Sequence, residues 1–175
     1  MSKLADGNKQ YETLRLWGPI PDAARWPSET QVLRVRDKNL IVPAKTYVST
    51  NMYGIHSDPR WWGLDSLEWN PKRWITIDPR TGRETIAQPP TGVPFLAWSV
   101  GPRICPGKKF SQVEFVAVIA TVLKSFRIKP QIIPGKMQTE KQARDALLDV
   151  VNDSVYVITP KISRPGDAGV VFTPR

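Results

Sequence analysis

The apolar residues between Phe110 and Phe126 recur at spacings of three and four, and this pattern constrains the fold more than any other feature of the chain. It predicts one long helix over Phe110–Phe126. The apolar arc of this helix is wide, which indicates that neighbouring elements bury it on most sides. The chain has 175 residues, of which 41% are hydrophobic, so it is long enough for one domain with a hydrophobic core.

Shorter elements are expected before this helix. Lys9–Trp17 is predicted to be a helix that ends at Pro19–Asp22, because proline cannot continue the helical hydrogen-bond ladder. Three β-rich segments then predict one small antiparallel sheet. These segments are Gln31–Arg36, Leu40–Val42 and Thr46–Thr50.

The segment from Gly54 to Pro94 is dense in Pro, Trp, Asp and Gly, which is typical of a long connection. Short helical turns are expected in it around Trp61–Leu67 and Pro71–Trp74. A connection of this length is unusual inside a compact domain and often has a function. After the long helix, strands are expected at Arg127–Ile133, Ser154–Pro160 and Val170–Phe172.

Composition excludes several classes of protein. Lysine and arginine number 25 against 16 aspartates and glutamates, a net charge of +9 that favours an acidic partner. The basic residues are scattered and match no nucleic-acid-binding module, so nucleic acid is not an expected partner. One cysteine and one histidine exclude an internal disulfide and a four-ligand zinc site. The sequence has no apolar run of membrane-spanning length and no signal-peptide pattern.

The single cysteine lies directly before the long helix, in Trp98-Ser-Val-Gly101-Pro-Arg103-Ile-Cys105-Pro-Gly107. A lone cysteine is more often an inert buried side chain. Here, however, Gly101 and Gly107 permit positive φ and let the backbone approach a flat ligand closely. The positive end of the following helix favours the thiolate form of the sulfur. Arg103 can neutralise a carboxylate on the same ligand.

This loop resembles the cysteine signature of the cytochrome P450 family, F-x-x-G-x-R-x-C-x-G, with Trp98 in the aromatic position. The resemblance implies that Cys105 is the axial ligand of the iron in haem b (iron protoporphyrin IX), and that Arg103 contacts a haem propionate. The two glycines of the loop would then lie against the haem. Arg25 lies near the place where the family often has a second propionate-binding arginine. Taken alone, it is an ordinary solvated arginine.

Two further segments resemble family motifs. Glu12-Thr-Leu-Arg15 is similar to the E-x-x-R motif, which by itself indicates only an exposed i,i+3 ion pair. Asn70-Pro-Lys-Arg73-Trp74 is similar to the family's P-x-R-F/W element. The resemblance therefore implies a buried Glu12–Arg15–Arg73 network that braces the cysteine loop. Buried charges persist only when they are fully paired, so this network is expected to be structural and not catalytic.

His56-Ser-Asp-Pro-Arg60-Trp61-Trp62 is similar to the family's H-x-D-P-x-x-W segment. His56 has no second histidine or orienting partner in the sequence, so we expect it to pack or to form a hydrogen bond rather than to bind a metal. Lys108 and Lys109 begin the long helix beside the cysteine loop. They are either a solvated helix start or a contact for an electron donor.

The fold implied by the resemblance is mainly α with small β-sheets (α+β), as a C-terminal fragment of the cytochrome P450 fold. Residues 1–175 are expected to form a partial cytochrome P450 domain. The motifs run from Tyr11 to about Pro160, whereas the family's oxygen-activating helix and most substrate-binding elements have no counterpart here. The leader Met1–Asn8 is expected to cut the first helix short. We therefore expect a gene fragment, a mis-assigned start or a truncated product.

By resemblance, the parent enzyme is a haem-thiolate monooxygenase that inserts one oxygen atom from O2 into a small organic substrate. Its electrons would come from NADPH-cytochrome reductase or a similar donor. The sequence looks most like filamentous-fungal members. Such proteins face the cytosol, and full-length relatives are often anchored in the endoplasmic reticulum by an N-terminal segment that is absent here. Catalysis by the 175-residue chain alone is not expected.

Two alternatives remain open from the sequence. One is a haem-binding fragment without catalysis, which shares every motif. The other is a basic interaction module without haem, in which Cys105 is merely buried.

Overall fold

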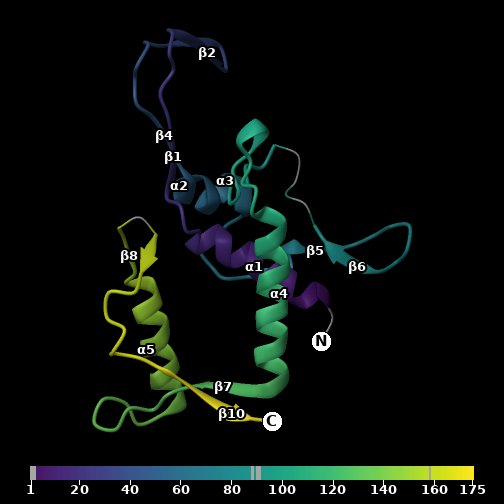
Figure 1. Cartoon of the computed structure of the whole chain (residues 1–175), viewed down its shortest axis with the longest axis vertical. Coiled ribbons are helices and arrows are strands. Elements are labelled where there is room, and N and C mark those ends of the chain that lie inside the picture. The colour runs from purple at the N-terminus through teal and green to yellow at the C-terminus, as the bar shows by residue number, and fades with distance from the viewer. Residues whose placement is uncertain (1–2, 88, 90–91, 158) are drawn as a thin grey trace.

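The computed structural model describes residues 3–87, 89, 92–157 and 159–175, with side chains in the first helix from Gly7 onward. Helices and small two-stranded sheets alternate along the chain, which is the predicted α+β class. The long helix α4 (Lys108–Ser125) runs through the centre of the view in Figure 1, and the first helix, α1 (Lys3–Trp17), lies against it. Among the described residues, no helix is long and apolar enough to cross a membrane.

Helix α1 begins earlier than predicted. It covers Lys3–Trp17, so most of the segment expected to be a non-helical leader continues the helix. The helix ends before Gly18-Pro19, because proline cannot continue the helical ladder.

The β-rich region forms two separate sheets, whereas the sequence predicted one. Strands β2 (Gln31–Val35) and β3 (Lys38–Val42) form an antiparallel hairpin that projects from the rest of the chain (Figure 1). Strand β4 (Val48–Asn51) pairs instead with β1 (Asp22–Arg25), a strand that the sequence analysis missed. The short, weakly apolar sequence of β1 gave no periodic signal, and its pairing is set by contacts distant in sequence.

The connection rich in Pro and Trp contains more regular structure than expected. It holds helices α2 (Met52–Ser57) and α3 (Pro59–Trp62), and the 3-10 helix η1 (Pro71–Trp74) at the predicted position. Asn51, Asp58 and Asn70 cap these elements, since each side chain accepts a hydrogen bond from a backbone N–H of the first turn. Strands β5 (Ile75–Ile77) and β6 (Glu84–Ile86) follow as a small hairpin, and η2 (Gly101–Arg103) lies further along.

The core of this half of the chain is aromatic. Tyr11, Trp62, Trp74 and Trp98 are all buried, and Phe95 packs among them. The Tyr11 ring lies 5.1 Å from that of Trp74 and 5.3 Å from that of Trp98, distances at which aromatic pairs attract each other. The tryptophans of the long connection thus pack on α1, and this packing makes an irregular segment hold one conformation.

Helix α4 agrees with the prediction in position but not in burial. It spans Lys108–Ser125, and none of its described residues is buried. Phe110 is 70% exposed and Val113 is 63% exposed. The contacts of α4 are chiefly with α1 and with the following strand, so one part of its apolar surface is partly covered and another part is exposed. The expectation that neighbouring elements bury this helix on most sides is therefore wrong for this chain.

The C-terminal part contains one helix that the sequence analysis missed. Strand β7 (Phe126–Pro130) pairs with β10 (Val170–Pro174), close to the strands predicted there. Between them lie α5 (Glu140–Asn152) and the short pair β8 (Val155–Tyr156) and β9 (Pro160–Lys161). A capping box between Thr139 and Gln142 starts α5, and this T-x-x-Q pattern is the signal that could have revealed it.

Candidate functional site

The loop that carries Cys105 is closed by backbone hydrogen bonds and leads directly into the N-terminus of α4. The Cys105 N–H donates to the carbonyl of Trp98 at 2.8 Å, which ties the residue to the start of the loop. The Lys108 N–H donates to the carbonyl of Cys105 at 3.2 Å, and α4 begins at this residue. The thiol is exposed. The loop thus presents a sulfur atom next to the amino end of a long helix.

The two glycines of the loop differ in conformation. Gly101 has φ of 72°, a left-handed conformation that side chains rarely adopt. Gly107 has φ of −79°, so it does not use the positive φ that glycine permits. A Cβ atom at Gly107 would lie 3.7 Å from the Cys105 sulfur. Glycine at position 107 therefore keeps the space beside the sulfur free.

An open cavity of about 740 Å³ lies beside this loop. Five of the six predicted cofactor-binding residues line it: Trp98, Arg103, Cys105 and Gly107 from the loop, and Arg25 from β1. Gly101 is not among the lining residues. Apolar side chains form much of the remaining wall; among them are Leu14, Ile20, Met52, Leu96, Ala97 and Phe110.

The two arginines differ in their contacts. Arg25 donates to the carbonyl of Ala24 at 2.8 Å and is otherwise exposed. Arg103 is exposed and forms no ion pair within the described part of the chain. One sulfur, two guanidinium groups and apolar walls fit a flat, mostly apolar ligand that carries carboxylates. These residues therefore fit haem.

Trp98 and Lys108 contact each other at the two ends of the cysteine loop. Trp98 is 8% exposed, and its indole N–H donates to the hydroxyl of Ser111 at 3.0 Å. The ammonium group of Lys108 lies 5.5 Å from the centre of the Trp98 ring, a cation–π distance. Lys109 is exposed. Only one of the two predicted lysines is therefore fully solvated.

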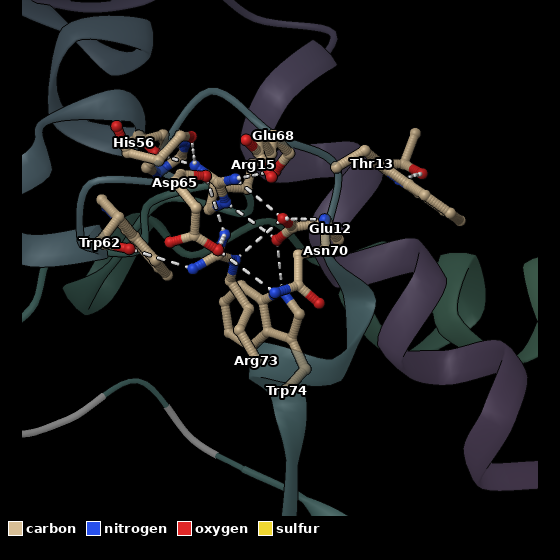
Figure 2. A network of polar contacts seen from close by, with 12 residues as sticks. Glu12, Thr13, Arg15, His56, Trp62, Asp65, Glu68, Asn70, Arg73 and Trp74 are labelled. Carbon is tan, nitrogen blue, oxygen red and sulfur yellow. Dashed lines mark hydrogen bonds and ion pairs between the residues drawn. The ribbon is translucent and has the colours of Figure 1, made fainter.

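The structure joins Glu12, Arg15 and Arg73 in one network (Figure 2). The carboxylate of Glu12 accepts from Nη2 of Arg15 at 2.8 Å and from Nε of Arg73 at 2.9 Å. The side chains of Glu12 and Arg15 are fully buried, and that of Arg73 is 14% exposed. Glu12 and Arg15 are therefore not an ordinary exposed ion pair on one helix.

The network also contains residues that the sequence analysis did not place in it. The Asn70 N–H and the Trp74 indole N–H donate to Glu12 at 2.9 and 2.8 Å. Arg73 donates to the carboxylate of Asp65 as well. Burial by itself would raise the pKa of Glu12, but the hydrogen bonds from Arg15, Asn70, Trp74 and Arg73 together lower it. Glu12 is therefore charged in the folded chain.

A family model described as cytochrome P450 matches residues 11–154 of the 175 residues. This chain belongs to the cytochrome P450 family. P450s are haem-binding monooxygenases that generally take electrons from redox partners and act on small organic molecules. The predicted family is thus confirmed.

Curated P450 relatives include fungal proteins. The phomenoic acid biosynthesis cluster cytochrome P450 monooxygenase of Leptosphaeria maculans is 34% identical over 80% of this chain and 26% of its own length. Cytochrome P450 monooxygenase 91 of Postia placenta is 36% identical over 66% of this chain and 23% of its own length. Noroxomaritidine synthase 1 of Narcissus pseudonarcissus is 33% identical over 79% of this chain and 25% of its own length. The chain spans about a quarter of the length of these relatives.

A crystal structure of the P450 CYP102L1 superposes with a TM-score of 0.64 at 23% identity, over 96% of this chain and 32% of that one. This likeness shows the fold, and it confirms the prediction of a fragment of the P450 fold with α+β character. The described residues contain no group of three or more His, Cys, Asp or Glu side chains that could hold a metal ion.

His56 is buried and forms a hydrogen bond, as expected. Its Nε2 accepts from the Leu96 N–H at 2.8 Å, and its carbonyl accepts from Arg15 at 2.7 Å. Burial, and to a lesser extent the neighbouring Arg15 charge, lowers the pKa of His56 to about 4. The imidazole is therefore neutral at physiological pH. It fixes the backbone just upstream of the cysteine loop.

Proposed function

We propose that this chain binds haem b through Cys105 and is the haem-ligand part of a P450 monooxygenase. The observation that carries the proposal is the shared cavity: the sulfur of Cys105 and the guanidinium groups of Arg103 and Arg25 line it together. On this proposal, residues 1–175 are a partial P450 domain. The activity, the substrate and the partners belong to a longer protein, since the chain spans about a quarter of its relatives.

Each residue of the site has a distinct part in this proposal. Cys105 would hold the haem iron through its thiolate, and Arg103 and Arg25 would pair with the haem carboxylates. Gly107 and Trp98, which line the same cavity, would form the wall against which the ring lies, and Gly101 would provide the turn of the loop through its positive φ. When bound, haem supplies the chemistry that activates O2, and a thiolate ligand favours cleavage of the O–O bond. The network of Glu12, Arg15 and Arg73 holds the loop in place and takes no part in the chemistry.

The exposed start of α4 is the proposed contact for the electron donor. Lys109 is exposed, and Lys108 lies beside the cysteine loop. Positive charge at this place favours an acidic surface such as that of NADPH-cytochrome reductase. The family also implies a small organic substrate, and a single unpaired cysteine fits a site that faces the reducing cytosol.

The test is reconstitution of the purified chain with haem, followed by reduction and addition of carbon monoxide. An absorbance maximum near ~450 nm is expected for thiolate ligation. Cys105→Ser should abolish this maximum. Arg103→Ala should weaken haem binding, whereas Arg80→Ala, a change at an exposed turn, should leave it unchanged. A Cys105→Ser variant with an unchanged spectrum would refute the assignment.

The reconstituted chain also separates the two other functions that the sequence allows, when O2 consumption is measured with a reductase. A chain that takes up haem but shows no substrate-dependent O2 consumption with a reductase is a haem-binding fragment without catalysis. A chain with no haem absorbance contradicts haem binding and leaves the basic interaction module as the remaining interpretation.

A further inference from the structure

We infer that Ser111 is a positioning residue for Cys105, because it joins the two ends of the cysteine loop on the first turn of α4. This role deepens the proposed haem binding and depends on it. Ser111 was not singled out by any sequence motif. The signal that could have revealed it is Trp98, since a buried tryptophan, unlike the phenylalanine usual at this place, needs an acceptor for its indole N–H.

Ser111 bonds to both ends of the loop. Its hydroxyl accepts from the indole N–H of Trp98 at 3.0 Å and donates to the carbonyl of Lys108 at 2.9 Å. Its backbone N–H donates to the carbonyl of Gly107 at 2.8 Å. Trp98 begins the loop and Gly107 ends it, so one residue fixes the distance between its ends.

The bond to Trp98 reaches Cys105 through the backbone. The carbonyl of Trp98 accepts from the Cys105 N–H at 2.8 Å. The Trp98 ring is buried against Tyr11 and Phe95, with ring centres 5.3 and 5.9 Å away. A ring held by packing and by the Ser111 hydroxyl fixes its own carbonyl, and through it the Cys105 amide.

Helix α1 holds Ser111 in turn. Nε2 of Gln10 donates to the Ser111 carbonyl at 2.9 Å, and Nε2 of Gln112 donates to the Tyr11 hydroxyl at 2.8 Å. Two neighbouring residues of α1 thus bond to two neighbouring residues of α4. Because α1 also carries Glu12, these ties connect the buried ionic network with the position of the cysteine sulfur.

The experiment compares Ser111→Ala, Trp98→Phe, the double variant and Ser111→Thr, all in the full chain. Thr121→Ala is the matched control, because the Thr121 hydroxyl also bonds to a carbonyl of α4 but lies far along the helix. The first readout is hydrogen exchange of the Cys105 amide in the haem-free chain. The second is the midpoint potential of the haem iron in the reconstituted chain.

We expect Ser111→Ala and Trp98→Phe each to speed hydrogen exchange of the Cys105 amide by about tenfold. This factor corresponds to the loss of about one hydrogen bond. The double variant should be no faster, since both changes remove the same bond. Ser111→Thr should restore slow exchange, and the potential should shift in Ser111→Ala and Trp98→Phe but not in Ser111→Thr or Thr121→Ala.

The outcomes separate the two proposals. Unchanged exchange and unchanged potential in Ser111→Ala and Trp98→Phe overturn the role of Ser111, even where the chain binds haem. If the unaltered chain takes up no haem, the proposed function fails; the exchange measurement then still decides whether Ser111 holds the loop.

Discussion

At the scale of single residues, the buried carboxylate of Glu12 is held by an extensive set of hydrogen bonds. Its two oxygens accept from two guanidinium groups, one indole N–H and one backbone N–H. A buried ion remains stable only when such partners compensate for its loss of water. Removing a partner should therefore cost far more free energy than removing an ion pair on the surface.

Arg15→Met tests this difference. We expect it to lower the free energy of unfolding by about 3–5 kcal/mol, because the buried Glu12 carboxylate loses one of its two guanidinium partners. The control is Arg60→Ala, which breaks the Arg60–Asp58 pair, whose arginine side chain is 75% exposed. That change should have little measurable effect on stability, because the pair is hydrated and screened by salt. Chemical denaturation measures both, and equal losses in the two variants would contradict the buried network.

A second prediction at this scale concerns how the stability of the chain depends on pH through His56. The folded pKa of His56, about 4, lies below its ordinary value of 6.5, so the unfolded chain binds more protons between these values. Stability should therefore fall as pH drops from 6.5 to 4, by up to about 3 kcal/mol. The lowered pKa of Glu12 acts in the same direction at still lower pH.

His56→Gln isolates the histidine contribution, because glutamine can still accept from the Leu96 N–H but does not titrate. Its unfolding free energy should be nearly flat from pH 6.5 to 5, where the unaltered chain loses stability. Parallel pH curves for the two proteins would show that His56 is not the group responsible.

Part of this site could be predicted from the sequence. Glu12, Arg15, Arg73 and Cys105 occur in patterned motifs, so their partners could be named before their positions were known. Ser111, Asn70 and Asp65 could not, because each takes part through a contact that depends on three-dimensional packing and not on spacing. The sequence also could not show that Gly107 has a negative φ and leaves space beside the Cys105 sulfur.

At the scale of elements, local signals were used unevenly. Helix α4 was predicted because it is rich in apolar residues, and η1 begins at an Asn-Pro pair. Helix α5 has both an amphipathic pattern and a cap at Thr139, so it was missed although its sequence carries clear local signals. The pairing of β1 with β4 joins segments about 26 residues apart, which no local pattern reveals.

The cap of α5 can be tested by itself. Thr139 accepts from the Gln142 N–H, and the Gln142 side chain accepts from the Thr139 N–H. We expect Thr139→Ala to destabilise α5 by about 1 kcal/mol, and Thr139→Ser to cost much less because it keeps the accepting oxygen. Hydrogen exchange of the α5 amides measures the effect. Equal exchange in the alanine and serine variants would show that the cap contributes nothing.

At the scale of the whole molecule, the chain leaves an unusual amount of surface open. Its accessible surface is 12849 Å², whereas a compact monomer of 19.8 kDa would expose about 8,600 Å². Exposed apolar side chains lie on α4 and on the β2–β3 hairpin; they include Val113, Val118, Val32 and Ile41. Apolar surface of this extent drives association.

We therefore expect the purified chain to associate at micromolar concentration, with a sedimentation coefficient above that of a 19.8 kDa monomer. Val113→Gln combined with Val118→Gln should weaken association, since both residues lie on the open surface of α4. The matched control is Leu64→Gln with Leu67→Gln, which changes two exposed leucines in a turn away from that helix. A monomeric unaltered chain would contradict the prediction.

The long sequence separation within the Glu12 network has a consequence for biosynthesis. Glu12 and Arg15 are made before their partners, because Asn70, Arg73 and Trp74 follow Glu12 by 58, 61 and 62 residues. At a translation rate of roughly 5–20 residues per second, the partners emerge roughly 3–12 s later. During that interval the charged face of α1 stays hydrated, so the nascent chain cannot close its core on the ribosome before the Asn70–Trp74 segment is available.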